Sequence, residues 1–209
     1  MKTIKLSLAL AISLLFANAM NAQTTFGVRA GVNFQNLNGK YPDGDKRMGK
    51  LRTGFNAGVN AEIPVGDGFY LQPGLLYSLK GAKAKGVELP FDVSLSYLEV
   101  PINFIYKPDL GQGRMLLGFG PYVAYAVGGK YEIGNTDTDI EFGSEPGELK
   151  RFDAGANFLA GYEFANNFSF QLNAQLGLGN MVNRASGDND SKLNNTGFGV
   201  SFGYRFGGR

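Results

Sequence analysis

Apolar and polar residues alternate with a period of two along most of the chain beyond residue 23. This period places successive side chains on opposite faces of a strand, so each stretch predicts a β-strand with one apolar and one polar face. The pattern repeats over about ten residues at a time with turn residues between, which is typical of a transmembrane β-barrel. The eight predicted strands cover residues 24–37, 53–64, 69–80, 95–107, 115–128, 152–164, 168–179 and 196–206.

The predicted connections alternate between short and long. Three are short, at residues 65–68, 108–114 and 165–167, and four are long, at residues 38–52, 81–94, 129–151 and 180–195. Outer-membrane barrels have short periplasmic turns and longer extracellular loops. We therefore predict an eight-stranded antiparallel up-and-down transmembrane β-barrel, with both termini in the periplasm.

Glycine positions indicate which face points inward. Fifteen glycines fall within the predicted strands, and all of them lie on the polar face. An eight-stranded barrel has an interior just wide enough for side chains, so small residues are needed there beside larger polar ones. We therefore expect the polar face to line the lumen and the apolar face to contact lipid.

Aromatic residues gather near the strand ends of the apolar face, where membrane barrels carry girdles at the headgroup level. The predicted periplasmic girdle consists of Phe69, Tyr106, Tyr162, Phe164, Phe168, Tyr204 and Phe206. An outer set consists of Phe34, Tyr77, Tyr125, Phe152 and Phe198. Pro73, Pro101 and Pro121 lie inside predicted strands, where a proline removes a donor from the ladder, so we predict local bulges there.

The N-terminal segment has the layout of a secretory signal peptide. Lys2 and Lys5 are followed by an apolar run over residues 6–16 and by small residues that allow cleavage after Ala19 or Ala22. The alternative of a retained membrane helix fits less well, since the run is shorter than the ~20 residues that span a bilayer.

We take residues 1–22 as the signal peptide and residues 23–209 as one barrel domain of the bacterial outer membrane. Residues 1–22 contain two Lys and no acidic residue, so their removal lowers the formal net charge from +2 to 0. A neutral chain without a basic patch gives no case for nucleic-acid binding.

Three short runs resemble the PorT-type outer-membrane β-barrel family of Bacteroidetes-like bacteria. They are Tyr97-Leu98-Glu99-Val100-Pro101-Ile102, Gly118-Phe119-Gly120-Pro121-Tyr122-Val123 and Gly161-Tyr162-Glu163-Phe164. The resemblance covers nearly all of residues 23–209, and it implies that Pro101 and Pro121 are ordinary features of the family. Some members are linked to protein secretion and gliding, which implies an envelope or secretion partner.

The last predicted strand resembles the signal that the barrel assembly machinery recognises. Phe202, Tyr204 and Phe206 alternate along it. The chain departs from the usual pattern because residues 207–209 follow the final aromatic residue.

Charged residues on the polar face are confined in the predicted lumen, where an unpaired charge is costly. Lys80, Lys107 and Asp153 are among them. Four others lie toward the periplasmic end, namely Arg29, Glu62, Glu163 and Arg205. We predict a structural ion network that fills the lumen, with a gated ion path as the alternative. The network consists of Arg29, Glu62, Glu99, Glu163 and Arg205.

The composition argues against an enzyme. The chain has no Cys and no His, which excludes disulfides, Cys or His metal sites and catalysis by a Ser–His or Asp–His pair. Known barrel enzymes of this membrane resemble one another in using a His. We predict a non-enzymatic protein without a cofactor.

Three of the long connections carry charge. The acidic residues of 129–151 and of 180–195 suit Ca²⁺ ligation or, more simply, a solvated loop. The first connection is basic and could contact lipopolysaccharide in the outer leaflet. Its charged residues are Lys40, Lys46, Arg47, Lys50 and Arg52 against Asp43 and Asp45.

The leading interpretation is an outer-membrane barrel with surface-exposed loops and a structural or binding role at the cell envelope. One alternative is an accessory of a protein secretion system. A second is a secreted, soluble ligand-binding barrel, which would need its apolar faces inward and no detergent for extraction.

Overall fold

The computed structural model describes residues 24–40, 46–48, 50–84, 91–134, 136–145, 148–183 and 191–207. The predicted signal peptide at residues 1–22 lies outside the described residues. Among the described residues, no helix is long and apolar enough to cross a membrane.

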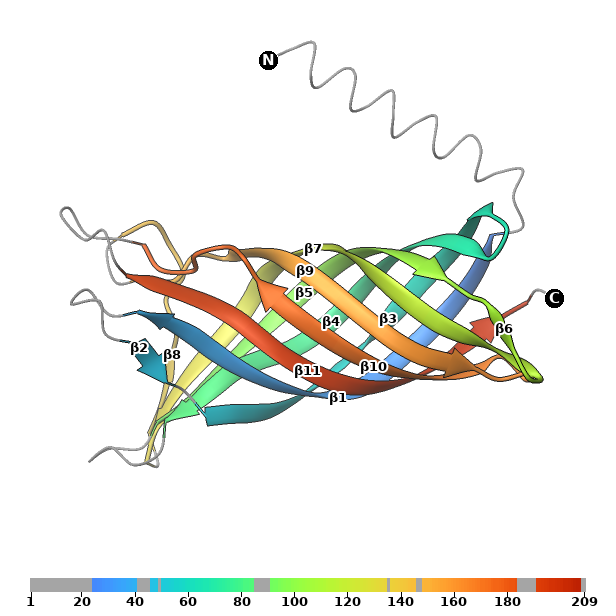
Figure 1. Ribbon diagram of the computed structural model, residues 1–209. Helices are drawn as coiled ribbons and strands as arrows, with labels where there is room; N and C mark the ends of the chain where they lie inside the picture. The colour runs from blue at the N-terminus through green and yellow to red at the C-terminus, as the bar shows by residue number, and fades with distance from the viewer. Residues whose placement is uncertain are drawn as a thin grey trace, which may run out of the picture.

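Eight long strands form a closed ring in which every neighbouring pair is antiparallel (Figure 1). They are β1 (Thr25–Lys40), β3 (Lys50–Gly66), β4 (Phe69–Ala84), β5 (Phe91–Tyr106), β7 (Gly113–Ile133), β9 (Phe152–Glu163), β10 (Phe168–Gly177) and β11 (Lys192–Phe206). Three short strands, β2 (Lys46–Met48), β6 (Asp109–Leu110) and β8 (Thr136–Asp139), pair at the ends of β1 and β7.

The ring closes where β1 pairs with β11, from Phe26 opposite Phe206 to Lys40 opposite Lys192. Consecutive long strands are neighbours, so the topology is up-and-down. The predicted eight-stranded antiparallel barrel is confirmed. We call the end where β1 begins and β11 ends the terminal end, and the opposite end the loop end.

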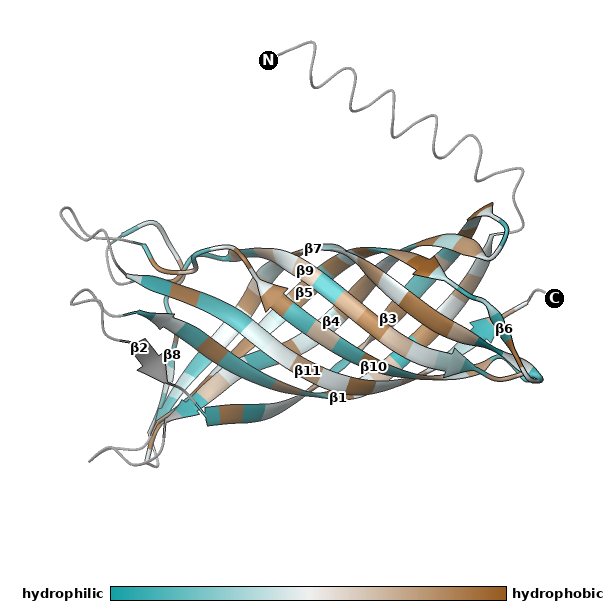
Figure 2. Ribbon diagram, viewed as in Figure 1, coloured by the Kyte–Doolittle hydropathy of each residue, from teal (hydrophilic) through white to brown (hydrophobic). Residues whose placement is uncertain are grey.

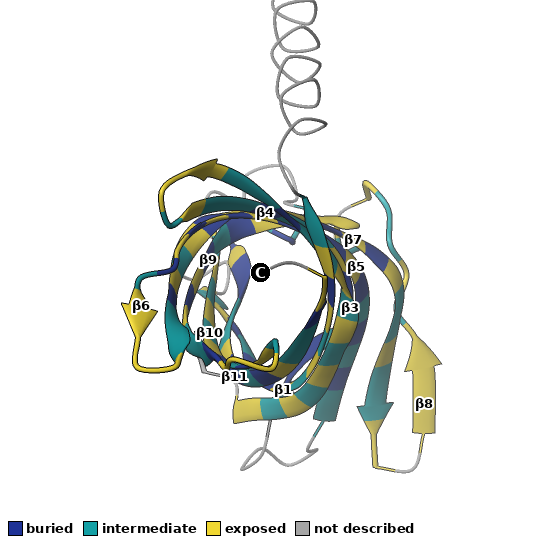
Figure 3. Cartoon of the chain, turned by 90° about the vertical axis from the view of Figure 1, so that its right-hand side faces the viewer, coloured by how far each residue is buried: buried dark blue, intermediate teal, exposed yellow. Residues whose placement is uncertain are grey.

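Along the strands, hydropathy alternates from residue to residue in Figure 2, and burial does so in Figure 3. On the outside, Phe26, Val59 and Phe119 are 62%, 53% and 59% exposed. In the lumen, Lys80 and Glu99 are 0% and 2% exposed. The apolar faces therefore point outward, and the polar faces line the lumen.

Glycine allows the strands to approach closely in this narrow interior. A Cβ atom added to Gly31 of β1 would collide with the Val200 carbonyl oxygen and the Ser201 hydroxyl oxygen of β11. Much of this contact is with backbone, which cannot turn away as a side chain can. A larger residue would therefore push the two strands apart.

The predicted bulges at the three prolines are wrong. Between β5 and β7, Pro101 faces Tyr122 and Phe104 faces Phe119, so the register is the same on both sides of Pro121 even though two pairs between them are missing. The ladders beside Pro73 and Pro101 behave in the same way. A proline removes one donor, and the pairs on either side keep the strands in register. The register shifts lie elsewhere, at Leu51/Asn56, Pro64/Gly66 and Ser96/Tyr97.

Most strands extend further toward the loop end than the sequence pattern predicts, although β9 begins at the predicted residue and β10 ends two residues earlier, at Gly177. β5 begins at Phe91, β7 continues to Ile133 and β11 begins at Lys192. These extensions cover parts of the predicted long connections. The outward apolar residues form a band around the barrel, which we call the apolar band. At the loop end the strands continue beyond this band.

Candidate functional site

Buried charged groups meet at the terminal end of the lumen. The Lys107 ammonium lies 2.7 Å from a Glu62 carboxylate oxygen and 2.8 Å from one of Glu163. Arg205 lies 2.8 Å from Glu62 and 3.4 Å from Glu163, and Arg114 lies 2.6 Å from Glu163. We call these five residues the terminal cluster.

The fold brings the terminal cluster together from the ends of five strands. Glu62 and Glu163 lie near the ends of β3 and β9, Arg205 near the end of β11, Arg114 near the start of β7, and Lys107 directly after β5. Lys107, Glu62 and Glu163 are at most 4% exposed in their side chains. Since three cations neutralise two carboxylates, every carboxylate here is paired, as a buried charge requires.

A second group of charges lies deeper, toward the loop end. The Lys80 ammonium lies 2.8 Å from Glu99 and 3.8 Å from Asp153, and 4.4 Å from the centre of the Tyr122 ring. The Tyr122 hydroxyl donates to Asp153 at 3.1 Å, and the Asn195 amide donates to the same oxygen at 2.8 Å. The Gln175 amide donates to Glu99 at 2.6 Å. Lys80, Glu99 and Asp153 form the loop-end cluster.

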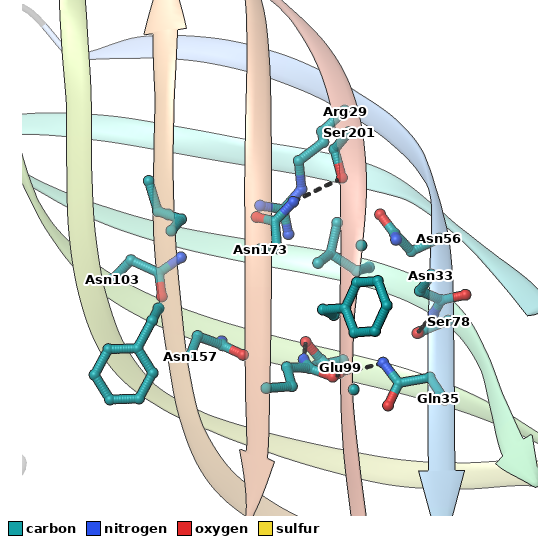
Figure 4. A pocket seen from close by; sticks show the side chains of 17 residues that line it. Arg29, Asn33, Gln35, Asn56, Ser78, Glu99, Asn103, Asn157, Asn173 and Ser201 are labelled. Atoms are coloured by element: carbon teal, nitrogen blue, oxygen red, sulfur yellow. Dashed lines mark hydrogen bonds between the residues drawn. The ribbon is translucent and has the colours of Figure 1, made fainter. Parts of the chain in front are cut away.

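Arg29 lies between the two clusters and makes no ion pair with a described residue. Its Nε has no hydrogen-bond partner there. It lines a polar cavity of about 40 Å³ together with Glu99 and a ring of amide and hydroxyl side chains (Figure 4). The labelled amides and hydroxyls around the cavity are Asn33, Gln35, Asn56, Ser78, Asn103, Asn157, Asn173 and Ser201.

The predicted ion network is thus divided among three places. Glu62, Glu163 and Arg205 meet in the terminal cluster, Glu99 pairs with Lys80 in the loop-end cluster, and Arg29 stands apart. Arg114 belongs to the terminal cluster but was assigned to a turn. The period-two pattern of Leu116, Gly118 and Gly120, extended backward by one step, places Arg114 on the inward face.

An apolar plug closes the lumen at the loop end, and the sequence pattern did not predict it. Its core includes Leu95, Tyr97, Ala126 and Met181, all 0% exposed, and Tyr122 at 1%. Side chains from the connections cover this core. The covering residues include Ile140, Phe142, Leu149 and Val182. The plug and the two charged clusters follow one another along the barrel.

The terminal end also holds an open cavity of about 510 Å³ outside the terminal cluster. Thr25, Tyr70, Gln112 and Asn167 are among its lining residues. Glu62, Glu163 and Arg205 form part of its wall. Ion-paired side chains therefore separate this cavity from the rest of the lumen.

The residues of the predicted periplasmic girdle pair across and along strands at the terminal end. Phe69 stacks on Tyr106 with ring centres 4.7 Å apart, and Phe168 lies 4.9 Å from Tyr204. Tyr162 lies 5.0 Å from Phe164, and Tyr204 lies 5.3 Å from Phe206. Phe26 faces Phe206 and extends the row onto β1, although the prediction did not include it.

The three residues of the predicted assembly signal follow one another on the outer face of β11. Phe202 and Phe206 are 64% and 52% exposed, and Tyr204 is half-buried between its aromatic neighbours.

The charges of the long connections are only partly within the described residues. Lys40 and Lys50 are exposed at the loop end, and Arg52 pairs with Asp92 at 2.7 Å. The side chains of Lys46 and Arg47, and residues 184–190 with Asp188 and Asp190, lie outside the described part. Among the described residues, no three acidic side chains gather closely enough to hold a metal ion.

Residues 16–183 match a family model described as outer membrane protein beta-barrel domain. Among solved structures, the chain is similar to Neisserial surface protein A, with 14% identity, 87% of this chain and 97% of that chain covered, and a TM-score of 0.49. It is also similar to OprG from Pseudomonas aeruginosa, with 13% identity, coverage of 90% and 98%, and a TM-score of 0.49. For Ail, the attachment invasion locus protein of Yersinia pestis, the values are 14%, 87%, 98% and 0.43. No curated protein sequence matches the chain.

Proposed function

Because this chain belongs to the outer membrane protein beta-barrel domain family, we propose that it is a closed, non-enzymatic barrel of the bacterial outer membrane. In this proposal the terminal end lies in the periplasm and the loop end faces the cell exterior. The barrel holds the protein in the membrane, and the strand ends and connections at the loop end, which form the rim, make the functional contacts.

The filled lumen is the observation that carries this proposal. An eight-stranded barrel leaves room only for its own side chains, and here they form the terminal cluster, the loop-end cluster and the apolar plug in series. Lys107 and Lys80 are 0% exposed in their side chains, although each sits at the centre of a charged cluster. A lumen built in this way supports a structural rather than a transport role.

The arrangement of the connections supports the orientation. At the terminal end, β3 joins β4 and β9 joins β10 through tight turns, and at the loop end the strands rise beyond the apolar band. Outer-membrane barrels keep their short turns in the periplasm and their long loops outside. The exposed apolar band between the two ends also argues against the soluble ligand-binding alternative, which needs its apolar side chains inside.

Conductance in a planar lipid bilayer tests the proposal. We expect the folded protein to insert without producing discrete channels, because each charged cluster must be broken before an ion can pass. Reproducible single-channel steps from the unaltered protein would contradict a closed barrel. An outer-membrane porin reconstituted under the same conditions is the positive control.

The resemblance to the PorT-type family adds a finer prediction, an envelope or secretion partner. Cross-linking in intact cells followed by purification of the barrel tests it, and recovery of the barrel alone would speak against an accessory role in secretion.

A further inference from the structure

Charged residues at the loop end lie in register across neighbouring strands, with like charges side by side. Lys192 of β11 faces Lys40 of β1, and Lys50 of β3 faces Lys83 of β4. These four lysines form what we call the basic arc. Lys40 also faces the backbone of Lys46 in β2 on its other side.

The sign of the charge changes on the next strand. Lys83 faces Asp92 of β5, Asp92 faces Glu132 of β7, and Glu132 faces Asp137 of β8. These three acidic residues form the acidic arc. Lysines therefore gather over β11, β1, β3 and β4. Acidic residues gather over β5, β7 and β8, although Lys130 of β7 lies 3.7 Å from Asp137 and neutralises part of the acidic arc. β8 is the strand that stands away from the ring in Figure 3.

The basic arc is exposed and only weakly neutralised within the described part of the chain. Lys40, Lys50 and Lys192 are exposed. The Lys83 side chain is 43% exposed and lies 3.2 Å from Asp92, but Asp92 is shared with Arg52 at 2.7 Å. One carboxylate thus faces two cations at the boundary of the arc.

This arrangement works against the stability of the isolated barrel. Like charges directly opposite each other on adjacent strands destabilise a sheet, and opposite charges stabilise it. A rim that mixed its lysines with its acids would relieve this repulsion. A polyanion bound to the basic arc gives the segregated charges a favourable partner.

The height of the arc indicates which polyanion. Lys40 is six residues beyond Phe34 on β1, which is about 20 Å along a strand and about 15 Å along the axis of a barrel with strands tilted by about 40°. Phe34 and Phe198, with ring centres 5.4 Å apart, mark the upper part of the apolar band. Lys40 and its partner Lys192 thus stand above the acyl chains, at the level of the phosphorylated sugars of lipopolysaccharide, and the register of β1 and β3 places Lys50 about half as far beyond Phe34.

We propose that the basic arc binds the phosphate groups of lipopolysaccharide in the outer leaflet, so that the lipid packs against one side of the barrel. This inference rests on the proposed orientation. The acidic arc repels the same phosphates, and it therefore leaves the opposite side of the rim free of lipopolysaccharide contacts.

The test is a titration of the folded full-length protein in detergent micelles with purified lipopolysaccharide, by calorimetry. We expect the double variants Lys40→Gln/Lys192→Gln and Lys50→Gln/Lys83→Gln each to weaken binding about thirtyfold, from the usual contribution of a lysine near an anionic surface. The variant with all four changes, the fourfold variant, should weaken binding about a thousandfold. Arginine at the four positions keeps the charge and should restore binding.

The acidic arc supplies the matched control. Glu132→Gln/Asp137→Asn removes charge from the same rim and should leave binding unchanged or tighter. The inference is overturned if the fourfold glutamine variant binds as tightly as the unaltered protein, or if dephosphorylated lipopolysaccharide binds equally well. The inference is also overturned if the protein binds a soluble sulfated polysaccharide as tightly as lipopolysaccharide, because the basic arc would then recognise negative charge in general and not this lipid.

A labelling experiment separates this inference from the proposed function. The chain has no Cys, so Thr138→Cys on the exposed β8 places one thiol at the loop end. Labelling of intact cells by an impermeant maleimide, together with unchanged binding in the fourfold variant, overturns the inference alone. Labelling only after the outer membrane is opened overturns the orientation, and with it both proposals.

Discussion

Alternation along a strand determines which face a charged residue occupies, but not which partner it meets. Arg29 and Glu62 were both assigned to the lumen near the same end. Glu62 faces Thr25 across β1 and β3, whereas Arg29 faces Gly58. The four-residue separation is about 13 Å along the strand, so Arg29 stands above the terminal cluster and Lys107 takes its place beside Glu62. Strand tilt and stagger set these heights, and the period of the sequence does not contain them.

The terminal cluster predicts a large effect for Glu62→Ala. The change leaves Glu163 as the remaining carboxylate for Lys107, Arg205 and the partly exposed Arg114. Removal of one partner from a buried ion pair costs about 3–5 kcal/mol. We expect the folded barrel to lose its heat resistance in detergent, seen as a lower temperature at which the compact band disappears on an electrophoresis gel.

Glu141→Ala is the matched control because Glu141 is exposed on a connection. It should leave that temperature unchanged. Equal temperatures for the Glu62 variant and the unaltered protein would show that the cluster does not stabilise the barrel.

At the scale of elements, all eight strands of the ring follow from the alternation, but their ends at the loop end do not. In β7, for example, Gly128 and Gly129 interrupt the alternation, and the register shift beside Ser96/Tyr97 changes its phase before residues 130–133 resume it. The apolar plug was missed for another reason. Tyr97, Tyr122 and Ala126 occupy inward positions, which the pattern assigned to a hydrophilic lumen.

Loss of the aromatic residues of β11 should impair assembly of the barrel into the outer membrane. Phe202→Ala/Tyr204→Ala/Phe206→Ala removes the alternating aromatics of the last strand, and we expect severalfold less folded barrel in the outer membrane, measured by heat-dependent gel migration of membrane fractions.

The control changes three outward residues of the neighbouring strand, Phe26→Ala/Val28→Ala/Val32→Ala, which are 62%, 42% and 45% exposed. If both variants assemble equally poorly, the effect belongs to lost apolar surface and not to recognition of β11. Tyr204 and Phe206 belong to both the aromatic girdle and the assembly signal. When the two variants are refolded into lipid without the assembly machinery, their yields of folded barrel should therefore differ less than they do in cells.

At the scale of the whole molecule, the lumen is closed at more than one level. The terminal cluster consists of ion pairs, whereas the apolar plug consists of packed side chains, and the two lie at opposite ends. A substitution in the terminal cluster leaves the apolar plug intact, and the reverse also holds. Disrupting only one of them should therefore not produce a channel.

Paired variants test this expectation. Lys107→Ala removes the centre of the terminal cluster, and Leu95→Ala/Tyr97→Ala removes buried volume from the plug. We expect no channels in planar bilayers from either change and small conductance steps only when the two are combined. Channels from Lys107→Ala alone, in protein that keeps its heat-dependent gel migration, would show that the plug does not close the lumen.

The outward placement of every second side chain has a consequence for how the polypeptide reaches its destination. In the proposed placement the chain spans a membrane, yet its mean hydropathy is only −0.13, because along most of each strand the outward apolar residues alternate with polar residues or glycine. No strand is greasy enough to be retained by a translocation channel on the way out of the cytoplasm, since a retained segment needs ~20 consecutive apolar residues. In the proposed export to the outer membrane, the same alternation that hides hydrophilic groups after folding would let the unfolded chain pass through the first bilayer and insert into the second.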